Sequence, residues 1–328
     1  MIRRVLILFL ILILGAGAFL FWSLAAPQAG LEQPVFVVIE PGTPTRTMAR
    51  QLTQAGVIKS DWSFLLARAI RPKAKLQAGE YRFQGSPTTL AVFDKIARGD
   101  IFYHELRIPE GANMFDIAAA VERLGIMQSE TFLRVARSPA LIQDLAPSAP
   151  SLEGYLFPST YRVARHTTAP QIAREMTNTF RKVWKELGGS GDVNRIATMA
   201  SLVEKETGVP EERPSVASVY RNRLRIGMKL DCDPTTIYAA LLQSRYRGTI
   251  YRSDLDSVHP YNTYRHPGLP PGPIANPGRD SLKAALHPAD TSFLYFVAKG
   301  DGSGAHIFSE NLGQHNAAVQ QYRNATSR

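Results

Sequence analysis

The sequence predicts an α+β fold that begins with a transmembrane helix, and three observations support this prediction. Residues 5–26 form an uncharged apolar run. Two segments, 38–58 and 107–127, resemble each other, and each combines a short strand pattern with an amphipathic helix pattern. The second half mixes helix patterns with two strand patterns at 293–298 and 306–309. We therefore expect a duplicated αβ region followed by a mixed α+β domain.

Composition and charge limit the class of protein. The chain has 328 residues, of which 45% are apolar and 20% charged, as in a folded protein with two domains. The formal net charge of +10 suggests an anionic partner, such as nucleic acid, a membrane surface or a wall polymer. The single cysteine, Cys232, excludes an internal disulfide framework, a multi-cysteine zinc site and an iron–sulfur cluster. Because it lies far from the apolar run, it also excludes a bacterial lipid anchor.

The apolar run at residues 5–26 is long enough to span a bilayer at about 1.5 Å rise per residue. Signal peptides have a shorter apolar region followed by small residues. Ala25, Ala26 and Ala29 could form such a cleavage site, so cleavage stays an alternative. The length of the run favours a permanent transmembrane helix.

Positive charge before the run predicts the topology. Arg3 and Arg4 precede the apolar residues, so we expect residues 1–4 to be a cytoplasmic tail. Everything after the run then lies on the outer side of the cytoplasmic membrane. This location argues against nucleic acid as the partner and in favour of anionic lipid or a cell-wall polymer.

The two similar segments each read as a strand, a glycine turn, an amphipathic helix and a glycine stop. Gly42 aligns with Gly111, and Gly56 aligns with Gly125. A strand–helix unit with Gly-Thr after the strand resembles LysM-type glycan-binding modules, so we expect a LysM-like duplicated αβ region over residues 34–137. A duplicated packing unit without a ligand stays an equal alternative, because a fold does not determine a function.

A loop rich in Pro, Ala and Ser at residues 138–150 predicts a domain boundary, with a catalytic domain over residues 151–328. The most informative helix of this domain is predicted over residues 193–207. At 100° per residue, Glu204 continues the apolar stripe of this helix near its C-terminal end. The acid Glu206 faces another direction, where we expect it to be solvated or paired.

The position of Glu204 suits a general acid for glycosidic-bond cleavage. Burial and the negative end of the helix dipole both disfavour the charged form of a carboxylate. The structural alternative is an ion pair between Glu204 and a nearby arginine, such as Arg221 or Arg223, because structural ion pairs also perturb acids.

Two loop features accompany this helix. Asp233 is predicted to cap a helix that starts with a proline, and capping alone would explain it. The loop at 259–278 contains six prolines and three glycines, which restrict its backbone. Its aromatic and amide side chains suit a sugar ring, which would make the loop a groove wall. A rigid connector is the alternative.

Five segments in order resemble the endolytic murein transglycosylase family, the YceG-like proteins. They are LEGYLFPSTY (152–161), ASLVEKET (200–207), RNRLRIGMKLDCDPTTIY (221–238), YNTYRHPGLPPGPIANPG (261–278) and AHIFSENLGQHNAAV (305–319). The resemblance covers nearly all of the chain after the apolar run. It implies a lytic transglycosylase, a lyase that cuts the MurNAc-β-1,4-GlcNAc bond of nascent peptidoglycan strands. The implied products carry 1,6-anhydroMurNAc ends, and the cut terminates strand elongation near the peptidoglycan synthases, which are candidate partners.

The resemblance matches the catalytic glutamate of the family to Glu204. One carboxylate can suffice in this chemistry, because the sugar's own 6-hydroxyl or acetamido group attacks the anomeric carbon. No cofactor or metal is implied.

Cys232 departs from the small polar residue expected at its position, and we interpret it as a buried thiol. We also expect substrate contacts from polar and aromatic side chains of the motifs, namely Glu153, Tyr155, Asn222, Asp233, Thr235, Tyr261, Asn262, Tyr264 and Asn276.

Two other functions stay open. One is a glycan hydrolase that uses the same acid and a water activated by Glu153 or Asp233. The other is a non-catalytic peptidoglycan-binding scaffold, which the repeat and the positive charge would support. A serine acyl-enzyme is excluded, because Ser201 and Lys205 are four residues apart, whereas the penicillin-binding pattern requires three. A metal site at His306 and His315 is not expected, because no known ligand motif includes them.

Overall fold

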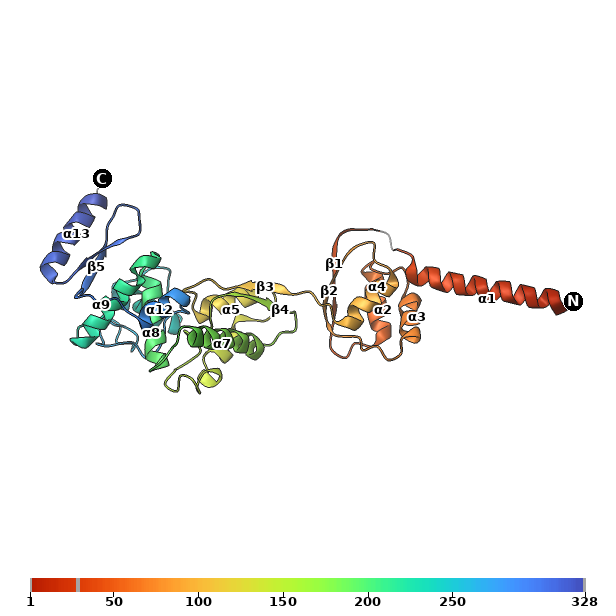
Figure 1. Cartoon of the computed structure of the whole chain (residues 1–328), viewed down its shortest axis with the longest axis horizontal. Coiled ribbons are helices and arrows are strands. Elements are labelled where there is room, and N and C mark those ends of the chain that lie inside the picture. The colour runs from red at the N-terminus through yellow and green to blue at the C-terminus, as the bar shows by residue number, and fades with distance from the viewer. Residues whose placement is uncertain (1, 28–29, 327–328) are drawn as a thin grey trace. The chain divides into compact units, whose positions relative to one another are not determined.

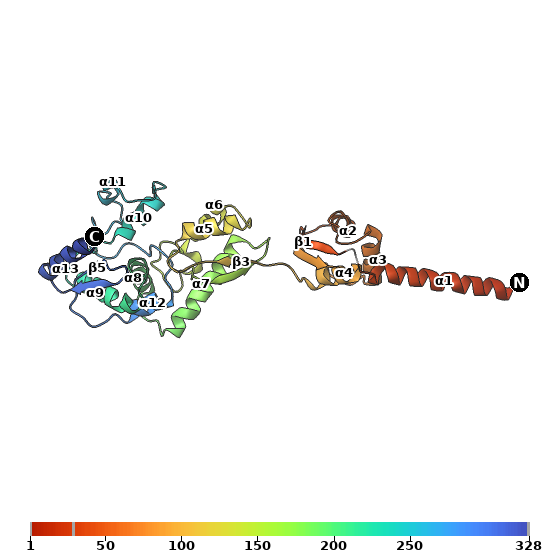
Figure 2. The same cartoon turned by 90° about the horizontal axis from the view of Figure 1, so that it is seen from above.

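The computed structural model describes residues 2–27 and 30–326. Ala29 of the candidate cleavage site, Met1 of the predicted tail and the last two residues of the predicted catalytic domain lie outside the described residues. The chain forms two compact units, shown in Figures 1 and 2. Unit 1 comprises Met1–Glu105 and Arg162–His166, and unit 2 comprises Leu106–Tyr161 and Thr167–Arg328.

Unit 1 begins with the predicted apolar helix. Helix α1 covers Ile2–Ala25, and its segment Val5–Ala25 is long and apolar enough to cross a membrane, although a signal sequence would pass the same test. The apolar side chains along most of this helix are exposed, whereas Leu24 near its C-terminal end is buried in the core of unit 1. Figure 1 shows α1 leading into the rest of the unit. This helix is consistent with a single-pass membrane anchor.

The remainder of unit 1 is a two-stranded antiparallel sheet covered by helices. Strand β1 (Leu31–Ile39) pairs with β2 (Gly79–Gly85), and Val37 lies opposite Tyr81. Both of these side chains are buried, as expected for a sheet with one covered face. The helices of this unit are α2 (Thr45–Gln54), α3 (Asp61–Ile70) and α4 (Thr89–Arg98).

Unit 2 contains the helices and strands of the second half. The short strands β3 (His104–Arg107) and β4 (Thr160–Val163) form one two-stranded sheet. The boundary between the two units falls inside each of these strands. Strands β5 (Tyr295–Ala298) and β6 (His306–Ser309) form an antiparallel pair. The longer helices are α5 (Met114–Arg123), α6 (Ser129–Ala136), α7 (Ala169–Glu186), α8 (Val193–Glu206), α9 (Arg213–Arg225), α10 (Asp233–Leu242), α12 (Arg279–Leu286) and α13 (Leu312–Thr326). Short helical turns are η1 (Pro139–Leu141), η2 (Pro210–Glu212) and α11 (Arg252–Leu255).

The centre of unit 2 is formed by α8, which packs against α12 and α9 (Figures 1 and 2). Its core contains Leu202 and Val203 of α8 and Val216 and Tyr220 of α9. The mixed α+β class and the helix predicted over residues 193–207 are therefore confirmed, because α8 covers Val193–Glu206.

The division of the chain differs from the predicted boundary at 138–150. The second of the two similar segments lies in unit 2, together with Glu204. Hydrogen bonds across the unit explain this: Gly111 N–H donates to the carbonyl of Asn276 at 2.9 Å, and Met114 N–H donates to Glu153 at 2.9 Å. The loop after η1 is therefore a connection inside unit 2.

Candidate active site

Helix α8 positions Glu204. The helix begins after Asp192, whose carboxylate accepts a hydrogen bond from Arg195 N–H at 3.0 Å, as an N-cap does. Val193, Ala197 and Ala200 are buried along one face, and Glu204 follows on the same face with only 6% of its side chain exposed. The expected continuation of the apolar stripe by a carboxylate is therefore confirmed.

Two donors hold the Glu204 carboxylate. The backbone N–H of Gly278, at the start of α12, donates to Oε2 at 2.9 Å. The guanidinium of Arg213, at the start of α9, lies 3.5 Å from Oε1. Because Arg213 is itself 9% exposed, this ion pair is shielded from water. The pair fixes the carboxylate in one orientation.

The arginine that pairs with Glu204 is not one of the two expected. Arg221 donates to the carbonyl of Ala289 at 2.9 Å, and Arg223 donates to the carbonyls of Leu294 and Leu230 at 2.7 and 2.8 Å. Both lie on α9 beyond its first two turns, so they reach other segments. Arg213 was missed because the bend through η2 that turns it back toward α8 leaves no pattern in the sequence.

Arg213 also brings two further carboxylates to the site. Its guanidinium lies 3.8 Å from Glu110 Oε2 and 3.7 Å from Asp280 Oδ2. Burial and the nearby Glu204 carboxylate raise the pKa of Glu110 above its ordinary value. The Glu110 side chain is 51% exposed, so it lies at the surface beside the nearly buried Glu204. Sequence reasoning missed Glu110, since it lies 94 residues before Glu204 in a segment interpreted only as part of a repeat.

Two glycines allow backbone segments to approach these carboxylates. Gly111 has φ +75° and a Cβ there would lie 3.5 Å from Glu204 Cγ. A Cβ at Gly278 would overlap the Glu110 carboxylate. The aligned glycine of the second similar segment therefore does more than form a turn: it lies against the candidate acid.

Asn276 ties together the three segments that surround the site. Its side-chain oxygen accepts from Gly154 N–H and Leu156 N–H, both at 2.9 Å. Its amide nitrogen donates to the carbonyl of Ala112 at 2.9 Å and to Glu153 Oε1 at 2.8 Å. All four groups are buried, so this amide is fully satisfied inside the protein. Asn276 is fully buried, and its hydrogen bonds determine the position of the segment that carries Gly278.

Glu153 is fully buried beneath this junction. Its Oε2 accepts from Met114 N–H at 2.9 Å, and burial raises the pKa of Glu153 to about 8. A side chain with 0% exposure meets neither a glycan nor an attacking water, so the structure contradicts both predicted roles of Glu153. It is a buried acid that is protonated at neutral pH.

The raised pKa of Glu153 makes stability depend on pH. Its carboxyl is protonated in the folded state up to about pH 8 and ionised above pH 4.5 in the unfolded chain, so the unfolded state binds fewer protons between these values. Stability is therefore expected to fall as pH rises from about 4.5 to 8, by up to about 1.4 kcal/mol per pH unit. Urea unfolding at several pH values measures this slope. The slope should be smaller in Glu153→Gln, and an equal slope in both proteins would contradict the assignment.

Most other predicted contact residues are buried and paired within the protein. The Tyr155 hydroxyl donates to the side chain of Asn194, and Thr235 donates to the carbonyl of Cys232. The Asn222 amide donates to the carbonyls of Thr291 and Phe293. The Asn262 amide donates to the carbonyls of Leu255 and Ser257. Tyr261 is 8% exposed and packs its ring against Tyr238. Their hydrogen bonds connect segments within the protein. They do not line the surface beside Glu204.

Asp233 and Tyr264 lie elsewhere, at a cavity of unit 2 with a volume of about 390 Å³. The Tyr264 hydroxyl donates to Asp233 Oδ1 at 2.6 Å. Helix α10 is preceded by Cys232 in the cap position, and Asp233 is its first residue, so the predicted capping role of Asp233 is wrong by one residue. Both side chains are at least partly exposed and remain available to a ligand.

Glu206 also lines this cavity and is paired, as expected for a side chain that faces away from Glu204. The Cys232 thiol donates to Glu206 Oε1 at 3.0 Å. Burial raises the pKa of Glu206, and burial followed by the nearby Glu206 charge raises the pKa of Cys232 well above its ordinary value. Cys232 is thus a buried thiol, and the thiolate needed for reactivity is disfavoured.

The histidines considered for a metal site have other partners. His306 Nδ1 lies 2.7 Å from Glu212 Oε2, and the His315 ring stacks on Tyr295 at 5.1 Å between centroids. Residues 2–27 and 30–326 contain no group of three or more His, Cys, Asp or Glu side chains that are placed to hold a metal ion.

The fold and the site define a class: an α+β protein with an N-terminal apolar helix and a nearly buried glutamate held by an arginine and a backbone N–H. The model of the YceG-like family matches residues 37–321 of this chain. The endolytic murein transglycosylase of Bacillus subtilis is 33% identical over 95% of this chain and 91% of its own length. The endolytic murein transglycosylase of Streptococcus pneumoniae is 29% identical over 92% of this chain and 61% of its own length.

A solved structure of a YceG-like protein is also similar to this chain. The crystal structure of a yceG-like protein from Listeria monocytogenes matches with a TM-score of 0.56 and 29% identity, over 88% of this chain and 99% of that one. The chain belongs to the YceG-like family. The family resemblance of the five sequence segments is therefore confirmed.

Proposed function

We propose that this protein is an endolytic peptidoglycan lytic transglycosylase, a lyase, with Glu204 as its general acid. Its family and the names of its relatives support the reaction class and the substrate class. The observation that carries the assignment of the acid is the Glu204 carboxylate, 6% exposed, held by the Gly278 N–H and Arg213. Such a fixed carboxyl group can deliver a proton to one defined position.

The proposed reaction cuts the MurNAc-β-1,4-GlcNAc bond without consuming water. Glu204 donates its proton to the glycosidic oxygen, and the bond between that oxygen and the anomeric carbon of MurNAc breaks. The 6-hydroxyl oxygen of the same MurNAc then bonds to the anomeric carbon, and its proton passes to Glu204. One product carries a 1,6-anhydroMurNAc end, the other a free 4-hydroxyl on GlcNAc, and the acid is restored.

The two donors on Glu204 fit this cycle. Gly278 N–H and Arg213 hold the Glu204 carboxyl in one position during both proton transfers. They therefore support Glu204 as the base of the second step.

Glu110 is proposed as a second carboxylate, which stabilises positive charge in the transition state. It shares the Arg213 guanidinium with Glu204 and is exposed where a strand can reach it. A carboxylate there would stabilise the positive charge that develops at the anomeric carbon. Glu110→Gln is expected to lower kcat about tenfold to a hundredfold with little change in KM. Steady-state kinetics on uncrosslinked glycan checks this, and a change confined to KM would point to substrate binding alone.

The side chains of Asp233 and Tyr264 are proposed as substrate contacts at the cavity that they line. Their hydrogen bond and partial exposure suit recognition of sugar hydroxyl or acetamido groups. A hydrolase would instead need a base for water, and the buried Glu153 cannot serve.

The two similar segments are proposed to be copies of one LysM-like unit. Each contains a strand, a glycine with positive φ and two packed helices: β1, Gly42, α2 and α3 in the first, and β3, Gly111, α5 and α6 in the second. Glycan binding is proposed for the first copy. In the second copy, the turn at Gly111 lies against Glu204. The N-terminus is proposed to lie in the cytoplasm and the chain after α1 on the outer side, near the synthases whose strands are terminated.

The size of the products tests the proposed function. Full-length protein in neutral detergent should convert long uncrosslinked strands into strands of intermediate length, because endolytic cleavage occurs inside the strand. Chromatography of the products by length measures this. Strand binding without any shortening would favour the scaffold function, and release of disaccharides alone would contradict an endolytic enzyme.

A further inference from the structure

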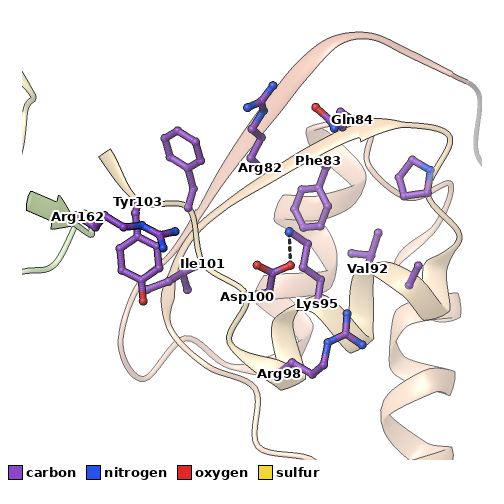
Figure 3. A pocket seen from close by; sticks show the side chains of 13 residues that line it. Arg82, Phe83, Gln84, Val92, Lys95, Arg98, Asp100, Ile101, Tyr103 and Arg162 are labelled. Atoms are coloured by element: carbon purple, nitrogen blue, oxygen red, sulfur yellow. Dashed lines mark hydrogen bonds and ion pairs between the residues drawn. The ribbon is translucent and has the colours of Figure 1, made fainter. Parts of the chain in front are cut away.

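Unit 1 contains a cavity of about 490 Å³ between β2 and α4, shown in Figure 3. Four cationic side chains line it: Arg82, Lys95, Arg98 and Arg162. Asp100 is the one acidic side chain among the described residues of the lining, so the lining carries a formal charge of +3. Neither Glu204 nor any other residue of the proposed reaction belongs to this cavity.

The arginines of the cavity are largely uncompensated. Lys95 and Asp100 neutralise each other across 2.6 Å, as the dashed line in Figure 3 marks. Arg82 and Arg98 are exposed and have no ion pair within the described part of the chain. Arg162 lies with its guanidinium 4.8 Å from the centre of the Tyr103 ring, which holds it at the cavity. Three guanidinium groups on β2, α4 and β4 thus surround one hollow.

The cavity is part of the unit that carries the apolar helix. Pro27, two residues after α1, forms a β-bridge with Thr88, which is the N-cap of α4. Leu24 of α1 is buried in the same core as Val92 and Phe93 of α4. Helix α4 has ten residues and is therefore about 15 Å long. The lining residues Pro87 and Ala91 lie close to Thr88 in the chain, and Arg98 is the last residue of α4.

We propose that this cavity binds the phosphate group of an anionic membrane lipid. The paired N–H groups of an arginine guanidinium match the spacing of phosphate oxygens. Several arginines on separate elements can therefore bind one phosphate, which has more than two acceptor oxygens. The position beside the end of α1 favours a lipid-borne phosphate over a free one, because the bilayer surface presents such groups at high local concentration. The bound headgroup would fix unit 1 at the membrane surface. This site is independent of the cleavage chemistry.

Native mass spectrometry of the full-length protein in neutral detergent tests the site. Phosphatidylglycerol is expected to remain bound, whereas zwitterionic phosphatidylcholine is not. The double variant Arg82→Ala/Arg98→Ala is expected to weaken phosphatidylglycerol binding about tenfold or more. The matched control is Arg46→Ala/Arg50→Ala, which removes two exposed arginines of α2 in the same unit and should bind as the wild type does.

Three results would overturn the proposal. Equal weakening in both double variants would mean that the lipid responds only to the net charge of the unit. Binding of inorganic phosphate without phosphatidylglycerol would mean a site for a free anion. Unchanged binding in Arg82→Ala/Arg98→Ala would mean that the lipid binds elsewhere. Glu204→Gln should retain the lipid, so failure of the proposed cleavage and failure of this site are separate outcomes.

Discussion

Glu204→Gln is expected to lower the rate of strand cleavage by at least about a hundredfold, the usual contribution of a general acid. Glutamine has no proton to donate to the glycosidic oxygen, yet its amide oxygen can still accept the hydrogen bond from Gly278 N–H. The geometry of the site should therefore survive. Cleavage of uncrosslinked strands, followed by chromatography, measures the loss.

The control for this variant is Glu130→Gln, which removes a carboxylate from an exposed ion pair with Arg137. It should cleave as the wild type does, because exposed pairs contribute little to stability. Thermal unfolding of both variants shows whether the fold is retained. Substantial cleavage by a folded Glu204→Gln protein would mean that another group donates the proton.

Asn276→Ala is expected to lower the free energy of unfolding by about 3–5 kcal/mol. The substitution leaves Gly154 N–H, Leu156 N–H and the carbonyl of Ala112 without their side-chain partner in a region closed to water. It also removes the donor to Glu153. Urea unfolding measures the change. Cleavage should fall as well, because the segment that carries Gly278 loses its support.

The comparison for Asn276→Ala is Asn311→Ala, which removes an exposed amide whose oxygen accepts from Gln314 N–H at 3.0 Å. Its cost should be about 1 kcal/mol, as for a helix cap. If Asn276→Ala costs no more than Asn311→Ala, the four buried hydrogen bonds do not form in solution as described.

Local patterns predicted the helices of this protein well and its division into units badly. Helix α8 follows from Asp192 at its start and one buried stripe, both of which are short-range signals. The assignment of residues 106–137 to unit 2 depends on the bonds of Gly111 and Met114 with residues far along the chain. Composition cannot reveal such contacts, and a loop rich in proline was mistaken for the boundary.

The candidate site shows the same contrast. Helix periodicity predicted the buried position of Glu204, because that face is set by residues of its own helix, and the family resemblance suggested its role. Arg213 and Glu110 come to it from other elements and could be found only in three dimensions. Tyr155, Asn222 and Asn262 looked like glycan contacts because their residue types also suit sugars. In this fold the same donors and acceptors satisfy buried backbone groups.

The mass of the reaction products tests the central claim most directly. Full-length wild type is incubated with uncrosslinked glycan, and the new strand ends are analysed by mass spectrometry. If Glu204 alone carries out the acid and base steps and the 6-hydroxyl attacks, each cut yields a 1,6-anhydroMurNAc end lighter than the hydrolytic product by one water. Reducing MurNAc ends as the main product would contradict the account, because they would require an activated water that this mechanism does not use.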